Sequence, residues 1–287
     1  MRRLIYFILL IGIYSCGNNN LKQDVNLQDD LGKSFVFKEK PKRVISLAPS
    51  ITESIYFINA DTNLVGVTKY CDYPDQTKSK IKVGGMLDPN LEIITTLNPD
   101  LIFLTIEGNS QVTYKSLIDL GYKVFVLNPR SVDGVITTLE KLNLIFKTQK
   151  GDLVISEFKS AVNRFTRKPT TQSYAGFLSL KPLISFNGTT FMSDVFYKSG
   201  FINLYKDEKL DYPSITEEDV FIKDPEYLFV FADSGESSKK MITEELESKF
   251  SKLKSVKNKK YFILDESIFS RPGPRILNSL QILSSIQ

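Results

Sequence analysis

The chain has 287 residues, of which 42% are hydrophobic, and a formal net charge of +4 with no histidine. This charge is too small to indicate a nucleic-acid-binding protein. The absence of histidine excludes Ser-His-Asp and Cys-His catalysis, zinc-dependent hydrolysis of the usual kind, and the commonest metal ligand of proteins.

The N-terminal segment has the features of a secretory signal. Two arginines follow Met1, and the apolar run over residues 4–14 is shorter than the roughly twenty residues that span a bilayer. The run stops near Cys16, and the sequence around this cysteine resembles the cleavage site of bacterial lipoproteins. The resemblance implies a signal peptide at 1–15, a lipid on the Cys16 thiol and a flexible tether at 16–28. An ordinary cleaved signal with an incidental cysteine is the alternative.

Length and cysteine content limit the rest of the architecture. No long apolar span follows residue 14, and the chain is long enough for two modest domains. Its only cysteines are Cys16 and Cys71. A lipidated Cys16 leaves Cys71 without a partner, so we expect no intramolecular disulfide even in an oxidising compartment.

Short strands alternate with helices in the first half of the chain. Ser50 is a candidate helix cap, and Asp88 followed by Pro89 is a typical helix start. The alternation predicts an α/β layer with a largely parallel sheet. The predicted strands are 43–47, 64–67, 101–104 and 123–127, and the predicted helices are 50–59, 88–98 and 110–120.

The pattern changes to helical spacing after residue 127. Proline is absent from 132–165, and Gly151 divides this stretch into a first helix at 132–146 and a second at 152–167. The second helix would be roughly 24 Å long, enough to cross from one domain to another. One more helix within a single domain is the alternative. The apolar stripe of the second helix comprises Leu153, Ile155, Phe158, Val162 and Phe165.

The second half returns to alternating strands and helices, and it contains an internal repeat. Glu92 lies seven residues before Pro99, and Glu218 lies seven residues before Pro225; each proline is followed by an acid and a strand. Chance similarity between two helix–proline–strand units is possible, but the matching order favours two similar lobes with a cleft between them. The predicted strands are 176–180, 227–231 and 260–264, and the predicted helices are 190–199, 216–222, 239–250 and 276–286.

The segment PKRVISLAPSITE at residues 41–53 looks like the opening motif of the cobalamin and iron-chelate binding proteins of ABC importers. The resemblance extends from about residue 29 to the C-terminus, and the order and spacing of several short motifs carry it. The other similar segments are 64–68, 71–74, 83–85, 89–92, 98–102 and 271–275.

The resemblance implies a fold of two α/β lobes joined by one long helix, with a ligand cleft between the lobes. The implied boundaries are 29–148 for the first lobe, 149–168 for the helix and 169–287 for the second lobe. Members of this family bind a bulky metal chelate and deliver it to the permease dimer of an ABC importer. We therefore expect a monomeric, lipid-anchored carrier outside the cytoplasm, with no catalytic activity, resident cofactor or metal site, and no nucleic-acid partner.

Residue roles follow from positions in the family's motifs. One glutamate on each lobe of such proteins pairs with arginines of the permease, and Glu92 and Glu218 occupy the matching positions. The alternative for each is a helix-terminal acid that complements the helix dipole. The residues implied to contact the ligand are Tyr70, Met86, Thr105 and Glu107 from the first lobe, with Tyr212, Phe269, Arg271 and Arg275 from the second. Rim packing and structural ion pairs are the alternative roles of these side chains.

The chain departs from the family pattern in one respect that bears on the ligand. Cobalamin carriers often have tryptophan in the cleft, whereas this chain has none, and Thr105 and Tyr212 stand where tryptophan would be expected. A corrinoid or a ferric siderophore therefore stays open, and haem would need Tyr70 or Met86 as its axial ligand. The other classes left open are a secreted α/β enzyme such as a hydrolase and a surface adhesion lipoprotein. The enzyme would lack the Gly-x-Ser-x-Gly elbow and the phosphate loop, because neither motif is present.

Overall fold

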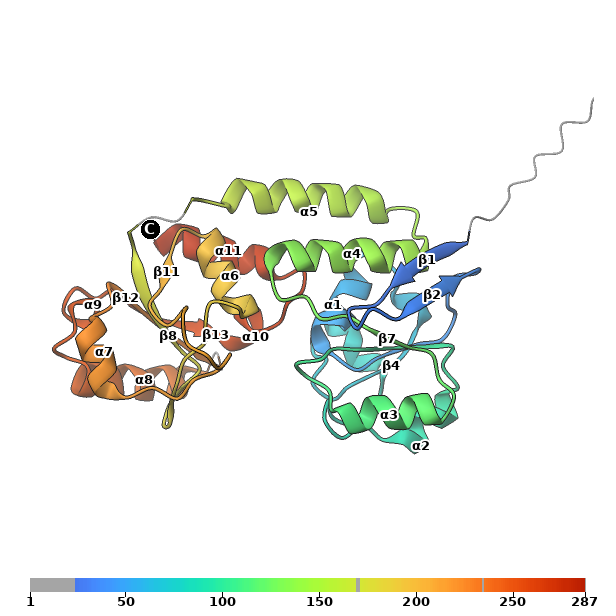
Figure 1. The fold of residues 1–287 in the computed structure, drawn as a ribbon, viewed down its shortest axis with the longest axis horizontal. Coiled ribbons are helices and arrows are strands. Elements are labelled where there is room, and N and C mark those ends of the chain that lie inside the picture. Colours follow the sequence, from blue (N-terminus) through green and yellow to red (C-terminus); the bar gives the residue numbers. More distant parts are fainter. Residues whose placement is uncertain (1–23, 169–170, 234, 287) are drawn as a thin grey trace, which may run out of the picture.

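The computed structural model describes residues 24–168, 171–233 and 235–286, and it contains two parallel sheets in separate lobes (Figure 1). The first sheet has five strands in the order β5-β4-β3-β6-β7, and all its pairings are parallel. Its strands are β3 (Val44–Ser46), β4 (Leu64–Val67), β5 (Ile81–Lys82), β6 (Leu101–Leu104) and β7 (Val124–Val126). The helices of this lobe are α1 (Pro49–Phe57), α2 (Leu91–Leu97) and α3 (Gln111–Asp119), with 3-10 turns at Asp61–Asn63 and Asp75–Ser79.

The second sheet repeats this plan with four parallel strands in the order β11-β8-β12-β13. Its strands are β8 (Ser173–Phe177), β11 (Ile202–Asn203), β12 (Tyr227–Ala232) and β13 (Tyr261–Asp265). A small hairpin, β9 (Ser179–Leu180) with β10 (Leu183–Ile184), follows β8. The helices are α6 (Phe191–Lys198), α7 (Glu217–Lys223), α8 (Glu236–Lys249), α9 (Lys254–Lys257), α10 (Glu266–Phe269) and α11 (Ile276–Ile286).

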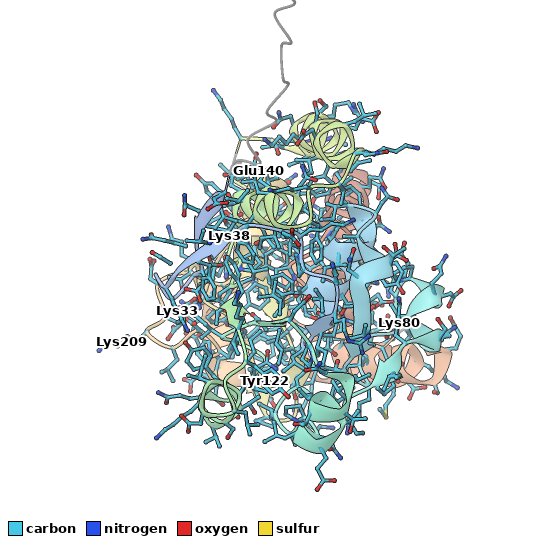
Figure 2. The ribbon with its side chains drawn as sticks, turned by 90° about the vertical axis from the view of Figure 1, so that its right-hand side faces the viewer. Lys33, Lys38, Lys80, Tyr122, Glu140 and Lys209 are labelled. Carbon is cyan, nitrogen blue, oxygen red and sulfur yellow. The ribbon has the colours of Figure 1, made fainter. Side chains whose placement is uncertain are left out.

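Two fifteen-residue helices, α4 (Val132–Phe146) and α5 (Gly151–Phe165), connect the lobes. Figure 1 shows α5 running above α4 from the first lobe towards the second. Phe158 on the inner face of α5 meets Phe57 edge-on, with ring centroids 5.3 Å apart, whereas Leu153 of the predicted stripe is 60% exposed. Seen end-on in Figure 2, α5 lies over α4, where Lys159 pairs with Glu140. The two parallel sheets and their helices confirm the predicted fold class of two α/β lobes, and α5 is the helix that takes the chain from the first lobe to the second.

One apolar core extends from the first lobe into the second along the side covered by α4 and α5. The same buried cluster includes Phe103 of β6, Leu139 of α4 and Phe196 of α6. Helix α11 of the second lobe contacts α5, and α6 contacts α4. The lobes are therefore packed together along this side.

The internal repeat corresponds to two equivalent structural units. Both α2 and α7 have seven residues, and each ends at a left-handed residue, Asn98 with φ 43° or Asp224 with φ 40°. A proline and an acid follow, and then the central strand β6 or β12 begins. A left-handed residue stops the helix, and the following proline cannot continue it. The same turn chemistry thus places α2 and α7 alike in the two lobes.

Several predicted boundaries were wrong by a few residues. Ala48, not Ser50, is the N-cap residue of α1, and Ser50 is buried in its first turn. Asn90, not Asp88, caps α2 by accepting a hydrogen bond from the Ile93 backbone N–H at 3.0 Å. The backbone at Pro89 is still extended, because this residue forms a β-bridge with Gly84. Strand β8 begins at Ser173, three residues before the predicted start.

The tether predicted for 16–28 does not extend to residue 28. Strand β1 (Val25–Gln28) pairs antiparallel with β2 (Ser34–Phe37), and this hairpin was not predicted. Its side chains alternate between exposed and buried, and Phe35 lies 4.9 Å from the Phe125 ring. Burial of this aromatic face stabilises the hairpin against the first lobe. The described residues include no helix long and apolar enough to cross a bilayer.

Candidate functional site

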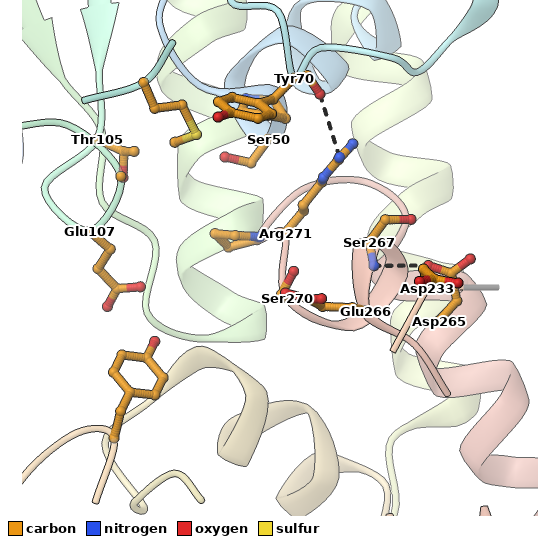
Figure 3. A pocket seen from close by; sticks show the side chains of 15 residues that line it. Ser50, Tyr70, Thr105, Glu107, Asp233, Asp265, Glu266, Ser267, Ser270 and Arg271 are labelled. Atoms are coloured by element: carbon orange, nitrogen blue, oxygen red, sulfur yellow. Dashed lines mark hydrogen bonds between the residues drawn. The ribbon is translucent and has the colours of Figure 1, made fainter. Parts of the chain in front are cut away.

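A cavity of about 730 Å³ opens between the two lobes. Its volume lies in the range of small-molecule sites in proteins. Figure 3 shows side chains from both lobes pointing into it. The lining residues are Pro49, Ser50, Tyr70, Met86, Thr105, Glu107, Gly108, Tyr212, Asp233, Asp265, Glu266, Ser267, Ser270, Arg271 and Pro272.

The first-lobe wall is formed where parallel strands end. Pro49 follows β3, Tyr70 follows β4, Met86 follows β5 and Thr105 follows β6. Ligands of open α/β sheets bind beyond the carboxyl ends of the strands, because the connecting loops converge there. The Tyr70 ring is 49% exposed, so it offers a flat apolar surface to a ligand.

The second-lobe wall is built by the same rule but has a different chemistry. Asp233 follows β12, Asp265 is the last residue of β13, and Glu266 begins α10. Tyr212 comes from the loop between β11 and α7, and it is 46% exposed. Burial and the carboxylate of Glu107 raise the pKa of Tyr212 to about 12. Its hydroxyl is therefore neutral at physiological pH and can donate a hydrogen bond.

A buried carboxylate links the lobes beside the cavity. Glu53 of α1 has a side chain that is only 1% exposed, and Arg275 of the second lobe binds it through two hydrogen bonds of 2.7 and 2.9 Å. Arg271 lies 3.3 Å from Glu53 and 2.5 Å from Asp72. A hydrogen bond from Arg271 holds the pKa of Asp72 below its usual range. We call these four residues the arginine clamp.

A second ion-pair group crosses between the lobes at the other end of the cavity. Arg130, which precedes α4, contacts Glu107 of the first lobe at 2.9 Å and Asp211 of the second lobe at 2.7 Å. The hydrogen bond from Arg130 lowers the pKa of Asp211, whereas burial raises the pKa of Glu107 despite the nearby guanidinium. The Arg130 guanidinium also donates to the Thr189 carbonyl oxygen at 3.1 Å. Residues on both sides of the cavity thus hold the two lobes in register.

Most of the predicted contact residues meet in this cavity. Phe269 does not, because it is fully buried and packs against Phe231 and Phe196 in the core. Arg275 also lies away from the cavity wall, since its guanidinium binds Glu53 and stacks 4.7 Å from the Tyr73 ring at a neighbouring hollow. The predicted residues that line the cavity are Tyr70, Met86, Thr105, Glu107, Tyr212 and Arg271.

Sequence reasoning missed the acidic residues of the second-lobe wall and the residues that link the lobes. A signal for the former was present, because Asp265 directly follows the predicted strand 260–264. Arg130 and Glu53 had no such signal, since their partners come from distant parts of the chain.

The other predicted residues lie apart from the cavity. Glu92 and Glu218 are exposed, each at the second position of its seven-residue helix. Cys71 is buried and lies 3.2 Å from the hydroxyl oxygens of Thr52 and Thr68, and burial raises the pKa of its thiol. Cys16 lies outside the described residues. Within the described part of the chain, no cluster of acidic or cysteine side chains has the arrangement of a metal site.

Known proteins share sequence and fold with this chain. A family model described as "Periplasmic binding protein" matches residues 44–268. The vitamin B12-binding protein of Photorhabdus laumondii is 30% identical over 241 residues, covering 83% of this chain and 84% of that protein. The solved periplasmic vitamin B12 binding protein of Vibrio cholerae has a TM-score of 0.76 and 26% identity, covering 86% of this chain and 96% of its own. A possible iron-binding, periplasmic solute-binding protein from Staphylococcus epidermidis has a TM-score of 0.73 and 28% identity, covering 86% and 99%.

The arginine clamp generates a stability prediction. Glu53→Gln removes the negative charge that compensates two partly buried guanidinium groups, so we expect a loss of about 3–5 kcal/mol in the free energy of unfolding. Asp72→Asn is the matched control, because its carboxylate is 61% exposed and the expected loss is below about 1 kcal/mol. Urea unfolding of both variants measures the difference. Equal losses of unfolding free energy in the two variants would contradict the prediction that the buried carboxylate of Glu53 stabilises the protein more than the exposed one of Asp72.

Proposed function

Because the chain belongs to the periplasmic binding protein family, we propose that it captures a bulky metal chelate between its lobes and delivers it to an ABC importer. The cavity between the carboxyl ends of the two parallel sheets carries this proposal. It is large enough for a small-molecule ligand, and its walls come from both lobes. The periplasmic location of the similar binding proteins supports a site of action outside the cytoplasm.

A corrinoid is the first candidate for the ligand, and a ferric siderophore is the second. The similar proteins named above are described as binding vitamin B12 or, for the Staphylococcus epidermidis protein, possibly iron. The exposed Tyr70 ring and the Met86 thioether offer the kind of surface on which a flat macrocycle packs. Thr105 and Tyr212, which stand where the resemblance implies tryptophan in cobalamin carriers, both line the cavity.

The ligand is tested by thermal shift with cyanocobalamin, cobinamide, ferric hydroxamate and catecholate siderophores, and haem. Binding stabilises the folded protein by RT ln(1 + [L]/Kd), about 2.7 kcal/mol at a hundredfold excess over Kd. Tyr70→Ala should weaken binding by about ten- to hundredfold, because a stacked aromatic surface is lost.

Tyr197→Ala is the matched control for the Tyr70 variant. Its ring is 55% exposed, similar to that of Tyr70, but it lies on α6 outside this cavity. The control should keep the affinity of the parent protein. Equal affinity of the Tyr70 variant and the control would place the ligand elsewhere, and a protein that responds to none of these chelates would refute the proposal.

Glu92 and Glu218 are proposed to be the contacts with the permease dimer. Both are exposed, and the equivalent units α2–β6 and α7–β12 place them at matching positions in the two lobes. Figure 1 shows α2 and α7 on the side of the molecule away from α5. Exposed ion pairs contribute little affinity but fix register and orientation, which suits a carrier that must dissociate after delivery.

The double variant Glu92→Ala, Glu218→Ala should reduce uptake through the cognate importer strongly while it leaves ligand affinity unchanged. Stability should fall by no more than about 1 kcal/mol for each helix terminus. Each single variant should give an intermediate defect, because one lobe keeps its anchor. Glu157→Ala on α5 is the control, since it removes an exposed acid far from α2 and α7. Normal uptake by the double variant would eliminate these glutamates as anchors.

Lipid attachment at Cys16 is proposed from the sequence around this residue. Cys16→Ser removes the thiol that would be acylated, so the mature protein should move from the membrane to the soluble fraction. Cys71→Ser is the control, because Cys71 is buried and cannot anchor the protein. Fractionation followed by immunoblotting measures the distribution, and complete retention of the Cys16 variant on membranes would contradict lipid anchoring.

A further inference from the structure

The cavity is strongly asymmetric in charge. Three carboxylates, Asp233, Asp265 and Glu266, lie close together on the second-lobe wall (Figure 3). Asp233 accepts from the Gly235 N–H at 2.8 Å, and Asp265 accepts from the Ser267 N–H at 2.8 Å. Both donors are backbone N–H groups, so neither of these hydrogen bonds pairs a carboxylate with a cation. Within the described residues, no lysine or arginine forms an ion pair with any of the three.

The positive groups near the cavity are already compensated. Arg271 is the single arginine on the wall, and it contacts both Asp72 and Glu53. Arg130 at the other end contacts Glu107 and Asp211. In the part of the chain that the structure describes, two further cations contact wall residues: Lys69 lies 5.2 Å from the centroid of the Tyr70 ring, and Arg275, which is paired with Glu53, donates to the Ser267 carbonyl oxygen at 3.0 Å. Four carboxylates therefore line the cavity, and Glu107 among them is paired with Arg130. The guanidinium on the wall, that of Arg271, is paired with Asp72 and lies beside Glu53, which Arg275 also binds.

The opposite wall has a complementary property. Tyr70, Met86 and Thr105 present a largely apolar surface, and the acidic wall faces it across the cavity. A flat chelate packed on Tyr70 would therefore direct part of its periphery towards the carboxylates. Amide N–H groups on that periphery would find strong acceptors, because hydrogen bonds to an ionised oxygen exceed those between neutral groups. Carboxylate groups at the same place would meet repulsion in a partly desolvated site.

We propose that the acidic wall of Asp233, Asp265 and Glu266 makes the carrier selective for neutral or cationic chelates with peripheral amide donors, and against anionic ones. This inference rests on the proposed function, since it concerns the same cavity and ligand class. It favours corrinoids that keep their amide side chains over chelates that carry free carboxylates or catecholates.

The test compares ligands of different charge in two pairs, of which the first shares one framework. Cyanocobalamin and its monocarboxylic acid, in which one propionamide is hydrolysed to propionate, form the first pair. A cationic ferric hydroxamate and a trianionic ferric catecholate form the second pair. At low ionic strength, isothermal titration should show that the anionic member of each pair binds at least about tenfold more weakly than its partner. Added salt should reduce this ratio of the two dissociation constants.

The double variant Asp233→Asn, Glu266→Gln should reduce this ratio by about threefold or more, because it removes two charges and keeps the shape of the side chains. Glu157→Gln on α5 is the matched control, since it removes an exposed carboxylate outside the cavity and should leave the ratio unaltered. Two results would overturn charge selection while the carrier function stands. One is that the anionic member of each pair binds as tightly as the other member, and the other is that the double variant leaves the ratio unchanged. Failure of all four chelates to bind would refute charge selection among them, and failure of the whole thermal-shift panel would refute the carrier function as well.

Discussion

The arrangement of the site depends on one buried carboxylate, that of Glu53. Its oxygens accept hydrogen bonds from Arg275, and Arg271 lies beside it, so a charge from the first lobe is neutralised only by the second. A buried carboxylate without its partners would be costly, which makes separation of the lobes at this point unfavourable. Because Arg271 belongs to the same segment around α10 as two of the acidic wall residues, Asp265 and Glu266, the interaction also sets the position of one wall relative to the other.

The two sheets then determine what can line the space between them. Their strands end towards the same cavity, so each loop that follows a central strand contributes a side chain to a wall. The repeat gives the lobes equal frameworks, but the loops differ, with an aromatic and thioether surface on one side and carboxylates on the other. The two lobes thus have similar frameworks but line the cavity with different side chains. The outer helices α2 and α7 occupy equivalent positions in the two lobes.

Most of the fold could be predicted because its signals are local. Helix α4 has the bounds that spacing predicted, and the turn at Asn98 and Asp224 repeats in the sequence as a proline followed by an acid. The β1–β2 hairpin was missed, because its strands are short and become stable only through packing on Phe125. Phe269 was misplaced for a related reason: the motif identified the segment but not the direction of the side chain, which α10 turns into the core. Long-range pairs such as Glu53 with Arg275 leave no trace in local spacing.

The continuous apolar core along α4 and α5 has a consequence for the proposed delivery to an ABC importer. Wide separation of the lobes would expose side chains such as Leu139 and Phe196, at about 25 cal/mol for each square ångström of apolar surface. We therefore expect empty and loaded molecules to have nearly the same outline. An importer that recognises only the outer surface of the protein would bind empty molecules as readily as loaded ones. Abundance of the carrier beyond the supply of nutrient would then slow uptake, so its synthesis should be matched to the nutrient and the number of importers.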